Sequence, residues 1–302
     1  MTRMEHLLAK VAEYSATEDT QRRKIVLDEL INELIAQLES ESRECRRDTL
    51  APLLAAMEKL RPHLFVLSPE GLTCKVSNPQ DLVRADKRID QFARDWMRSF
   101  RSDGCFYDVG SNVGTFGIYA AKIHGPSLRT YAFEFHFPTF ATLCANVIAN
   151  DVEESVLPLH LALGRDSGVG TAYFRSLESG SALHQLDQAV DYKGDAFEPG
   201  CRMLTCRASL DTLCDAWGFR PPDYLKIDTD GNEYDVVLGA RETLTRSRAL
   251  EVLVEFVHHS DAADRLEKMT AVMQECGLSL ARSSPRRRIA NLPIEDLLFT
   301  KG

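Results

Sequence analysis

The first part of the chain has an apolar pattern that predicts helices. Leucine and isoleucine recur at three- and four-residue steps among arginine, lysine and glutamate, for example at Leu27, Leu30 and Leu34. This spacing places the apolar side chains on one face of a helix. We expect a helical N-terminal region over residues 1–67, followed by a separate domain over residues 68–302.

The pattern differs on the two sides of Gly104. Before it, residues 81–100 predict one helix with Leu82, Ile89, Phe92 and Trp96 on one side. After it, short apolar runs alternate with amphipathic stretches. The apolar runs, which predict strands, are residues 105–109, 130–135, 157–163, 224–227 and 250–257. The amphipathic stretches, which predict helices, are residues 114–123, 137–150, 234–245 and 261–276.

This alternation is typical of βαβ units, which build a mainly parallel sheet. Two more apolar runs follow at residues 278–281 and 296–300. The link between them is too short for the helix that a parallel connection needs, so we expect these two strands to pair antiparallel. The predicted fold class is α/β: a doubly wound, mainly parallel, seven-stranded sheet with an N-terminal helical extension.

Composition narrows the class of protein. The chain has 302 residues, of which 44% are hydrophobic, so it can bury a substantial core. No apolar run approaches the ~20 residues that span a bilayer, and the N-terminus lacks the pattern of a secretory signal. The eight cysteines form no CxxC pair, which favours reduced thiols over disulfides or a zinc site. We expect a soluble cytoplasmic protein.

The distribution of charge argues against nucleic acid as a partner. The net charge is −9, and most of it falls in residues 101–302. A region this acidic does not attract nucleic acid or an anionic membrane over a distance.

The most informative motif is a glycine-rich turn between a predicted strand and a predicted helix. An apolar strand leads into Asp108, which is followed by Gly110 and Gly114 and then by the helix pattern. Glycines let the backbone turn sharply and approach a ligand closely. Twenty residues past Gly114, Glu134 ends the next predicted strand, where a carboxylate can accept both hydroxyls of a ribose.

The spacing within this motif separates two nucleoside cofactors. A dinucleotide needs the spacing G-x-G-x-x-G, because its pyrophosphate must approach the middle glycine. Here the second position after Gly110 is Asn112. A side chain at this place is tolerated when no pyrophosphate has to fit. The motif therefore favours S-adenosylmethionine (SAM), which has a ribose and no phosphate.

Over about residues 70–302 the sequence resembles the FkbM family of methyltransferases. The matching pieces occur in the family's order: Asp108–Gly114, Ala132–Glu134, Asn146, Asn150, Ala162–Gly164, Ser209–Asp211, Lys226–Glu233, Leu238–Ala240 and Val254–Glu255. The resemblance implies a Rossmann-like fold and SAM-dependent O-methylation of a small-molecule or carbohydrate acceptor. The chain departs from the family at Ser111, Phe135 and Thr229–Asp230, where alanine, proline and Val-Glu are usual.

The resemblance also implies contacts for the cofactor. The residues expected to line the methionine end of SAM are Asp108, Gly110, Ser111, Asn112 and Gly114. Glu134 should hold the ribose. The residues expected beside adenosine are Phe135, Ala162 and Leu163. Asp228 should stand at the end of the fourth strand, facing the methyl group.

Candidate catalytic residues come from the carboxyl ends of the strands, where ligands bind in open α/β sheets. For an alcohol acceptor the protein must align the hydroxyl and remove its proton. His258 is the first choice as base, because histidine titrates near neutral pH. Asp228 could serve instead or orient the acceptor, and Lys226 could stabilise an alkoxide. Lys226, Asp228 and Glu233 could equally form a structural ion-pair network.

Metal use is not favoured, because the carboxylates at the strand ends lack a defined ligand spacing. Residues 165–202 form a long connection that could act as a lid. Arg282 and Arg286–Arg288 could bind a phosphate or carboxylate on an anionic acceptor, or could form a solvated turn.

Two alternatives stay open from the sequence. One is an N- or RNA-directed methyltransferase. The other is a non-catalytic module that binds a partner through its N-terminal helices, which could also form a homodimer.

Overall fold

The computed structural model describes residues 65–301 apart from 192, 194, 248, 249, 259–261, 290 and 291, together with residues 6, 9–13, 22, 26 and 29. The chain divides into two compact units, Met1–Val66 and Leu67–Gly302. The predicted leucine stripe at residues 27, 30 and 34, and the dimer proposed for it, lie outside the described residues. None of the helices described combines the length and the apolar character needed to cross a membrane.

The part of the chain described from residue 65 onward begins with short elements. They are β1 (Phe65–Leu67), β2 (Thr73–Lys75), α4 (Pro79–Asp86) and α5 (Gln91–Arg98). The single helix expected over 81–100 is therefore two helices. Each starts at its own side-chain cap, since Asn78 accepts the Gln80 and Asp81 amides and Asp90 accepts the Ala93 amide. Consequently Leu82 is 50% exposed, whereas Trp96 is fully buried.

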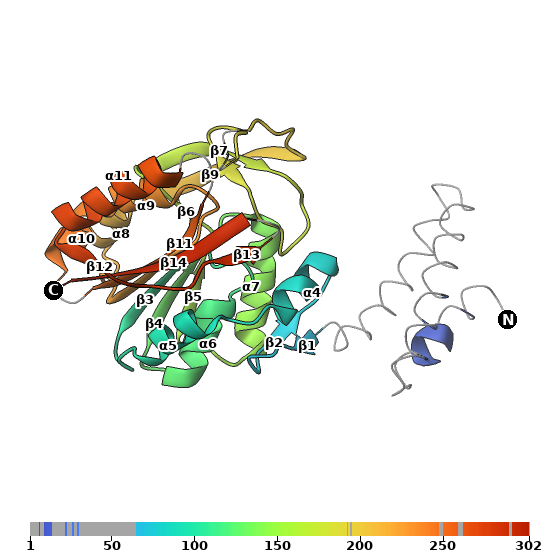
Figure 1. The fold of residues 1–302 in the computed structure, drawn as a ribbon. Helices are drawn as coiled ribbons and strands as arrows, with labels where there is room; N and C mark the ends of the chain where they lie inside the picture. The colour runs from blue at the N-terminus through green and yellow to red at the C-terminus, as the bar shows by residue number, and fades with distance from the viewer. Residues whose placement is uncertain are drawn as a thin grey trace. The chain divides into compact units, whose positions relative to one another are not determined.

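The main sheet has the strand order β12-β14-β11-β10-β3-β4-β5 (Figure 1). Its parallel part consists of β3 (Cys105–Val109), β4 (Arg129–Phe133), β5 (Val156–Leu159), β10 (Tyr224–Ile227) and β11 (Glu251–Val257). The other strands are β12 (Leu278–Ser283), β13 (Arg287–Ile289) and β14 (Leu292–Lys301). The expected antiparallel pairing of the last two predicted strands is confirmed by β12 and β14. β14 is longer than predicted because it also pairs with β11 and β13.

Helices cover both faces of this sheet, as the predicted doubly wound fold requires. One face carries α6 (Thr115–His124) and α7 (Phe137–Ala149). The other carries α8 (Leu210–Asp215), α9 (Glu233–Leu238), α10 (Arg241–Arg246) and α11 (Ala262–Glu275) (Figure 1). Every residue of the central strand β3 is buried, which explains why it reads as a continuous apolar run. The predicted α/β fold class is confirmed, but the main sheet described has eight strands instead of the predicted seven, because β13 also pairs with β14.

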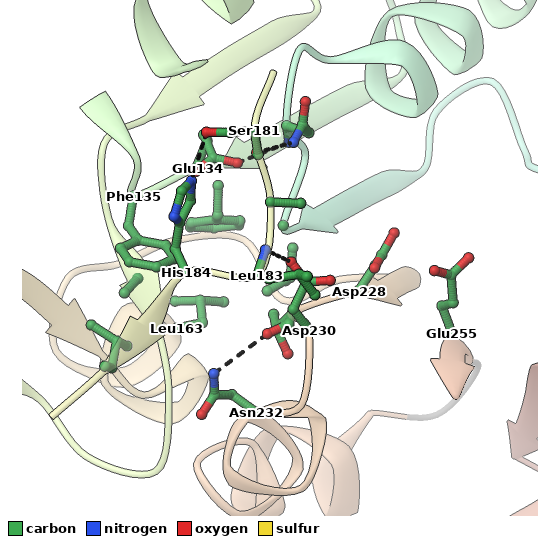
Figure 2. A pocket seen from close by; sticks show the side chains of 18 of the residues that line it. Glu134, Phe135, Leu163, Ser181, Leu183, His184, Asp228, Asp230, Asn232 and Glu255 are labelled. Atoms are coloured by element: carbon green, nitrogen blue, oxygen red, sulfur yellow. Dashed lines mark hydrogen bonds between the residues drawn. The ribbon is translucent and has the colours of Figure 1, made fainter. Parts of the chain in front are cut away.

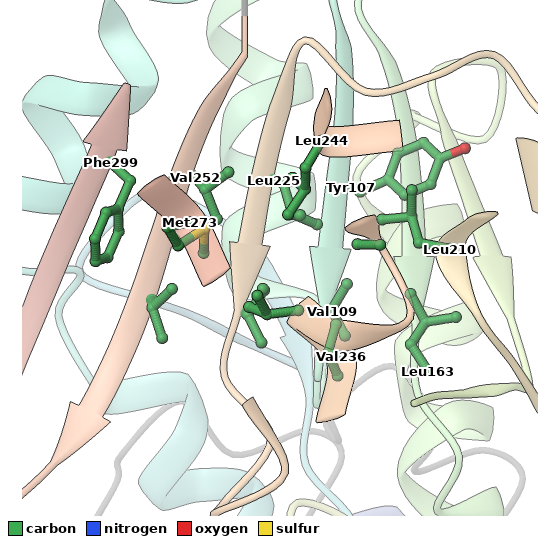
Figure 3. Close-up of a cluster of buried hydrophobic side chains, with 14 of the residues drawn as sticks. Tyr107, Val109, Leu163, Leu210, Leu225, Val236, Leu244, Val252, Met273 and Phe299 are labelled. Atoms are coloured by element: carbon green, nitrogen blue, oxygen red, sulfur yellow. The ribbon is translucent and has the colours of Figure 1, made fainter. Parts of the chain in front are cut away.

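The core lies between the sheet and α8–α11 (Figure 3). Alternate residues of the strands, such as Tyr107, Leu225 and Val252, point toward Val236 of α9 and Met273 of α11. Each fully buried aliphatic or aromatic side chain of this kind contributes roughly 1.5–3 kcal/mol. This packing holds β3, β10 and β11 in register, so that their carboxyl ends meet at one edge.

A second, four-stranded sheet corrects two predictions. Residues 157–163 do not form one strand, because β5 joins the main sheet whereas β6 (Ala162–Leu163) pairs with β9 (Cys201–Ala208). The connection over 165–202, expected to be a loop, contains β7 (Gly168–Phe174), β8 (Gln185–Leu186) and the start of β9. The run Thr171–Phe174 is rich in strand-forming residues. The strand β7 is hard to recognise in the sequence because glycines interrupt the pattern at its start.

Candidate active site

The glycine-rich turn lies where β3 and β10 end side by side. Gly110 has φ +74, and a methyl group placed on it would lie 1.8 Å from the carbonyl oxygen of Asp228. Only glycine allows this approach of two backbones. The amides of Gly110 and Ser111 both donate to the Phe133 carbonyl, at 3.1 and 2.9 Å. The ends of β3, β4 and β10 are thereby drawn together.

Glu134 is fixed at the end of β4 by two backbone amides. Its carboxylate accepts the Asn112 amide at 3.0 Å and the His136 amide at 2.7 Å. The side chain is buried, and burial raises its pKa to about 7. A carboxylate has about four lone-pair sites, so two remain for other donors.

A cavity of about 310 Å³ opens beside Glu134. This volume falls within the roughly 300–1,000 Å³ of small-molecule sites. Figure 2 shows Glu134, Phe135 and His184 grouped toward one end and Asp228 and Glu255 toward the other. The first end suits a flat apolar ring, and the second suits polar or charged groups.

A segment over residues 176–186, which we call the strap, forms one wall of this cavity. Its Ser181 carbonyl accepts the Asn112 side-chain amide at 3.1 Å, and its Leu183 amide donates to Asp230 at 2.7 Å (Figure 2). The Gly180 amide donates to the Thr139 hydroxyl at 3.0 Å. The strap is thus tied to the glycine turn, to α7 and to the loop after β10.

Two side chains that line the first cavity have displaced pKa values: His184 of the strap, and Asp230, which accepts a hydrogen bond from the strap. Burial, followed by the charge of Asp228, raises the pKa of Asp230 to about 6. Burial lowers the pKa of His184 to about 3, so this imidazole is neutral at physiological pH. At neutral pH His184 is therefore uncharged, whereas Asp230 is mostly ionised.

Lys226 lies at the centre of an ion-pair group behind the glycine turn. Its ammonium is 3.1 Å from the Asp228 carboxylate and 3.6 Å from Asp108, and 4.5 Å from the centre of the Phe116 ring. Burial lowers the pKa of Lys226, but the facing carboxylates outweigh it and hold the pKa above its usual range. Lys226 in turn outweighs burial at Asp228 and holds the pKa of that carboxyl below its usual range. Both groups are charged at neutral pH.

A second cavity, of about 220 Å³, adjoins the first. The two share the lining residues Arg84, Lys87, Gly110, Asn112, Asp228 and Glu255. Glu255 contacts Arg287 at 2.6 Å, and its side chain is 17% exposed. Burial, followed by the charge of Asp228, raises the pKa of Glu255 to about 7. The cavities therefore meet at two carboxylates that differ in charge state: Asp228 is ionised at neutral pH, and Glu255 is close to half-protonated.

Most of the residues predicted for the cofactor line these cavities. Those on the first cavity are Gly110, Asn112, Glu134, Phe135, Ala162, Leu163 and Asp228. Ser111 and Lys226 line the second. Asp108 and Gly114 line neither. Asp108 is buried under the turn, where it accepts the Gly117 amide at 3.0 Å, and Gly114 begins α6 against Leu143.

Two predicted catalytic residues lie outside both cavities. His258 has the same parity along the chain as Phe256, and the centres of the two rings are 5.1 Å apart. Its Nε2 is 2.9 Å from the Glu295 carboxylate. Glu233 accepts the Thr229 and Gly231 amides and pairs with Arg265 at 3.2 Å. Glu233 therefore holds the loop after β10, and its ion pair is with Arg265, not with the Lys226–Asp228 network expected as the structural alternative. His259 is outside the described residues.

Other site residues were not anticipated. Asp230 and Glu255 lie near the ends of predicted strands but had no role assigned to them, and the base predicted at the end of the same strand as Glu255 was His258. The alternation of side chains along a strand could have identified Glu255. Glu255 and Val257 line the first cavity, whereas Phe256 and His258 do not. Of the predicted arginines, Arg287 lines the second cavity, whereas Arg286 pairs with Glu295 at 3.1 Å. Arg84 and Lys87 precede the first motif, which begins at Asp108, so no motif pointed to them.

The expectation that the site uses no metal stays a prediction. Within the residues that the structure describes, no group of three or more histidine, cysteine or carboxylate side chains is arranged to hold a metal ion.

Known proteins resemble this chain in sequence and in fold. The methyltransferase FkbM domain matches residues 108–280, which is more than half of the chain. No curated protein matches significantly. Similar solved structures include a methyltransferase FkbM from Methylobacillus flagellatus KT, with 13% identity and a TM-score of 0.43 over 66% of this chain and 44% of that one.

Two further structures are similar at the same level. A putative transferase from Pyrococcus horikoshii has 12% identity and a TM-score of 0.46, covering 78% of this chain and 70% of that one. A precorrin-6y C5,15-methyltransferase from Geobacter metallireducens GS-15 has 13% identity and a TM-score of 0.42, covering 72% and 93%. The chain spans 44% of the length of the first of the three structures. On the match over residues 108–280, the chain belongs to the FkbM family of methyltransferases, and its cofactor is S-adenosylmethionine.

Proposed function

We propose that this protein transfers a methyl group from SAM to a hydroxyl of a small-molecule or carbohydrate acceptor. The observation that carries the proposal is the junction of the two cavities at Asp228 and Glu255. One cavity is large enough for a nucleoside, and the other offers a separate space for an acceptor. The free cysteines among the described residues support a reducing, cytoplasmic location.

The first cavity is the proposed SAM site. SAM supplies a methyl group on a positively charged sulfur, which is already activated for transfer. The two unused lone-pair sites of Glu134 fit the ribose hydroxyls, and Phe135 and Leu163 offer apolar surface to adenine. Gly110 and Asn112 would lie along the methionine part. The side chain of Asn112 is tied to the strap at the position where a dinucleotide would need room for its pyrophosphate.

Glu255 is the proposed general base, in place of His258. Transfer to an alcohol forms an oxygen–carbon bond and breaks the carbon–sulfur bond, and the hydroxyl proton must go to a base. A base works best when its pKa lies near the working pH, and the pKa of Glu255 is raised to about 7. Asp228 is held ionised by Lys226 and is the weaker base of the two, so we assign it the orientation of the acceptor hydroxyl.

The experiment uses the full chain with labelled SAM and a panel of polyols and sugars. We expect label in a hydroxyl-bearing product, and Glu255→Gln should lower kcat by about 10²- to 10⁴-fold with little change in SAM affinity. The wild-type rate should rise as the pH increases through about 7, because only the ionised carboxylate accepts a proton. Burial and the charges of Asp228 and Asp296 raise the pKa of Glu255, and the charges of Lys87 and Arg287 lower it.

Glu251→Gln is the matched control. Glu251 stands at the other end of β11 and accepts the Trp96 indole N–H, which glutamine can also accept. If Glu255→Gln keeps the wild-type rate and pH profile, Glu255 is not the base. If SAM binds but nitrogen acceptors alone take the label, the O-methylation proposal is wrong.

A further inference from the structure

The second cavity carries more positive charge than its carboxylates can balance. Its basic lining residues are Arg84, Lys87, Arg88, Lys226 and Arg287. Two of them are neutralised within the protein. Lys226 faces Asp108 and Asp228, and Arg287 faces Glu255 at 2.6 Å and Asp296 at 2.6 Å.

The other three cations have no carboxylate partner in the described part of the chain. Arg84 donates its Nε–H to the Gly180 carbonyl at 2.8 Å, which leaves the two terminal nitrogens of its guanidinium available. Lys87 and Arg88 are exposed, and their side chains have no hydrogen bond or ion pair among the described residues.

The backbone holds these cations in place. Arg84 is in the last turn of α4, and Lys87 and Arg88 lie in the short link to α5. The link ends at Ile89, which is buried; its amide donates to Glu70 at 3.1 Å and its carbonyl accepts Arg94 at 2.8 Å. An anchored backbone lowers the conformational entropy that this segment loses when it binds a ligand.

From this geometry we infer that the acceptor carries an oxyanion, a phosphate or a carboxylate, which binds to Arg84, Lys87 and Arg88 while its hydroxyl reaches Glu255. The inference rests on the proposed function, because it assigns the second cavity to the acceptor. The anionic group has to lie at the Lys87–Arg88 side, since Asp228 and Glu255 repel it from the other. Guanidinium groups bind oxyanions through paired, charge-assisted hydrogen bonds.

The three residues lie outside residues 108–280, which match the family domain. The acceptor preference is therefore a property of this chain's own N-terminal segment of the second unit. A simpler role for Lys87 is to offset the nearby acids, since its charge lowers the pKa of both Asp228 and Glu255. Binding measurements separate that role from anion recognition.

The first measurement titrates inorganic phosphate into the full chain saturated with S-adenosylhomocysteine, at low ionic strength. We expect phosphate to bind, and Lys87→Gln/Arg88→Gln to weaken binding by about 10- to 100-fold. Arg98→Gln is the control, because Arg98 is 56% exposed, pairs with Asp95 and lines neither cavity. Equal phosphate affinity in the double variant and the control would overturn the inference.

The second measurement compares transfer to glucose, glucose 6-phosphate and glucuronate. An anionic sugar should react at least about 10-fold faster than glucose, and the double variant should remove this preference. The faster of the two anions identifies phosphate or carboxylate as the recognised group. Methylation that ignores acceptor charge contradicts the inference but leaves O-methylation intact. If no sugar reacts, a phosphate affinity that depends on Lys87 and Arg88 supports the anion site while the proposed function fails.

Discussion

Replacement of Gly110 by alanine tests the geometry on which the whole site depends. The new methyl group would lie 1.8 Å from the Asp228 carbonyl oxygen, where real contacts are not shorter than 3.0 Å. The two backbones must therefore separate by about 1 Å or more. This movement displaces Asp228 from the junction of the cavities and breaks the close pairing of β3 with β10.

The expected magnitude has two parts. A non-glycine residue at positive φ costs roughly 1–2 kcal/mol, and forcing an atom into a packed space costs about 1–3 kcal/mol more. Gly218→Ala isolates the first part, because Gly218 has φ +72 and nothing within 4 Å of the added methyl group. Gly110→Ala should thus lose about 2–5 kcal/mol, and Gly218→Ala about 1–2 kcal/mol. In a unit of this size each kcal/mol lowers Tm by about 2–4 °C.

The assay combines thermal unfolding with calorimetric titration of S-adenosylhomocysteine well below Tm. Gly110→Ala should lower Tm more than Gly218→Ala does and should weaken cofactor binding by about 100-fold, since displacements near 1 Å have effects of this size. Gly218→Ala should bind the cofactor as the wild type does. If the two variants have the same Tm and the same affinity, the close approach of Gly110 to Asp228 does not support the site.

Three further substitutions test other parts of the reasoning. Glu134→Ala should weaken S-adenosylhomocysteine binding by about 10- to 100-fold, measured by calorimetry. The affinity of the wild type should fall as the pH decreases through about 7, because protonation of Glu134 removes acceptor sites for the ribose, and the affinity of the variant should depend less on pH. Lys226→Met should lower the free energy of unfolding by about 3–5 kcal/mol in urea titrations, since it leaves Asp108 buried without its cation; a loss below about 1 kcal/mol would contradict the ion-pair assignment. His258→Gln should keep kcat within about threefold, because His258 lines neither cavity, and a loss of 100-fold would restore it as the base.

The sequence predicted those parts of the fold that depend on local pattern. β3 could be located because both its faces are buried and its residues form a continuous apolar run. The separation of α4 from α5 depends on the side-chain caps Asn78 and Asp90. The sequence suggested one helix because apolar residues continue at helical spacing across the link between the two. The departure of β6 into a second sheet could not be read from residues 157–163, because the partner strand β9 lies some 40 residues later.

The candidate site was predictable on the cofactor side and less so on the acceptor side. Gly110 and Glu134 follow from motif spacing, which encodes backbone constraints directly. The base does not, because the choice between Glu255 and His258 depends on strand parity and on the burial that raises the pKa of Glu255. Arg84 and Lys87 reach the site through tertiary structure alone, from α4 and the link after it, which precede every motif.

The position of β14 between β11 and β12 has a consequence for how the protein is made. β12 reaches the main sheet only through β14, so this edge is incomplete until residues 292–301 have been synthesised. At translation rates of about 5–20 residues per second, the interval between Val257 and Lys301 amounts to several seconds. During that interval the apolar edge of β11 is unpaired on a nascent chain, and it is the segment where we expect chaperones to bind.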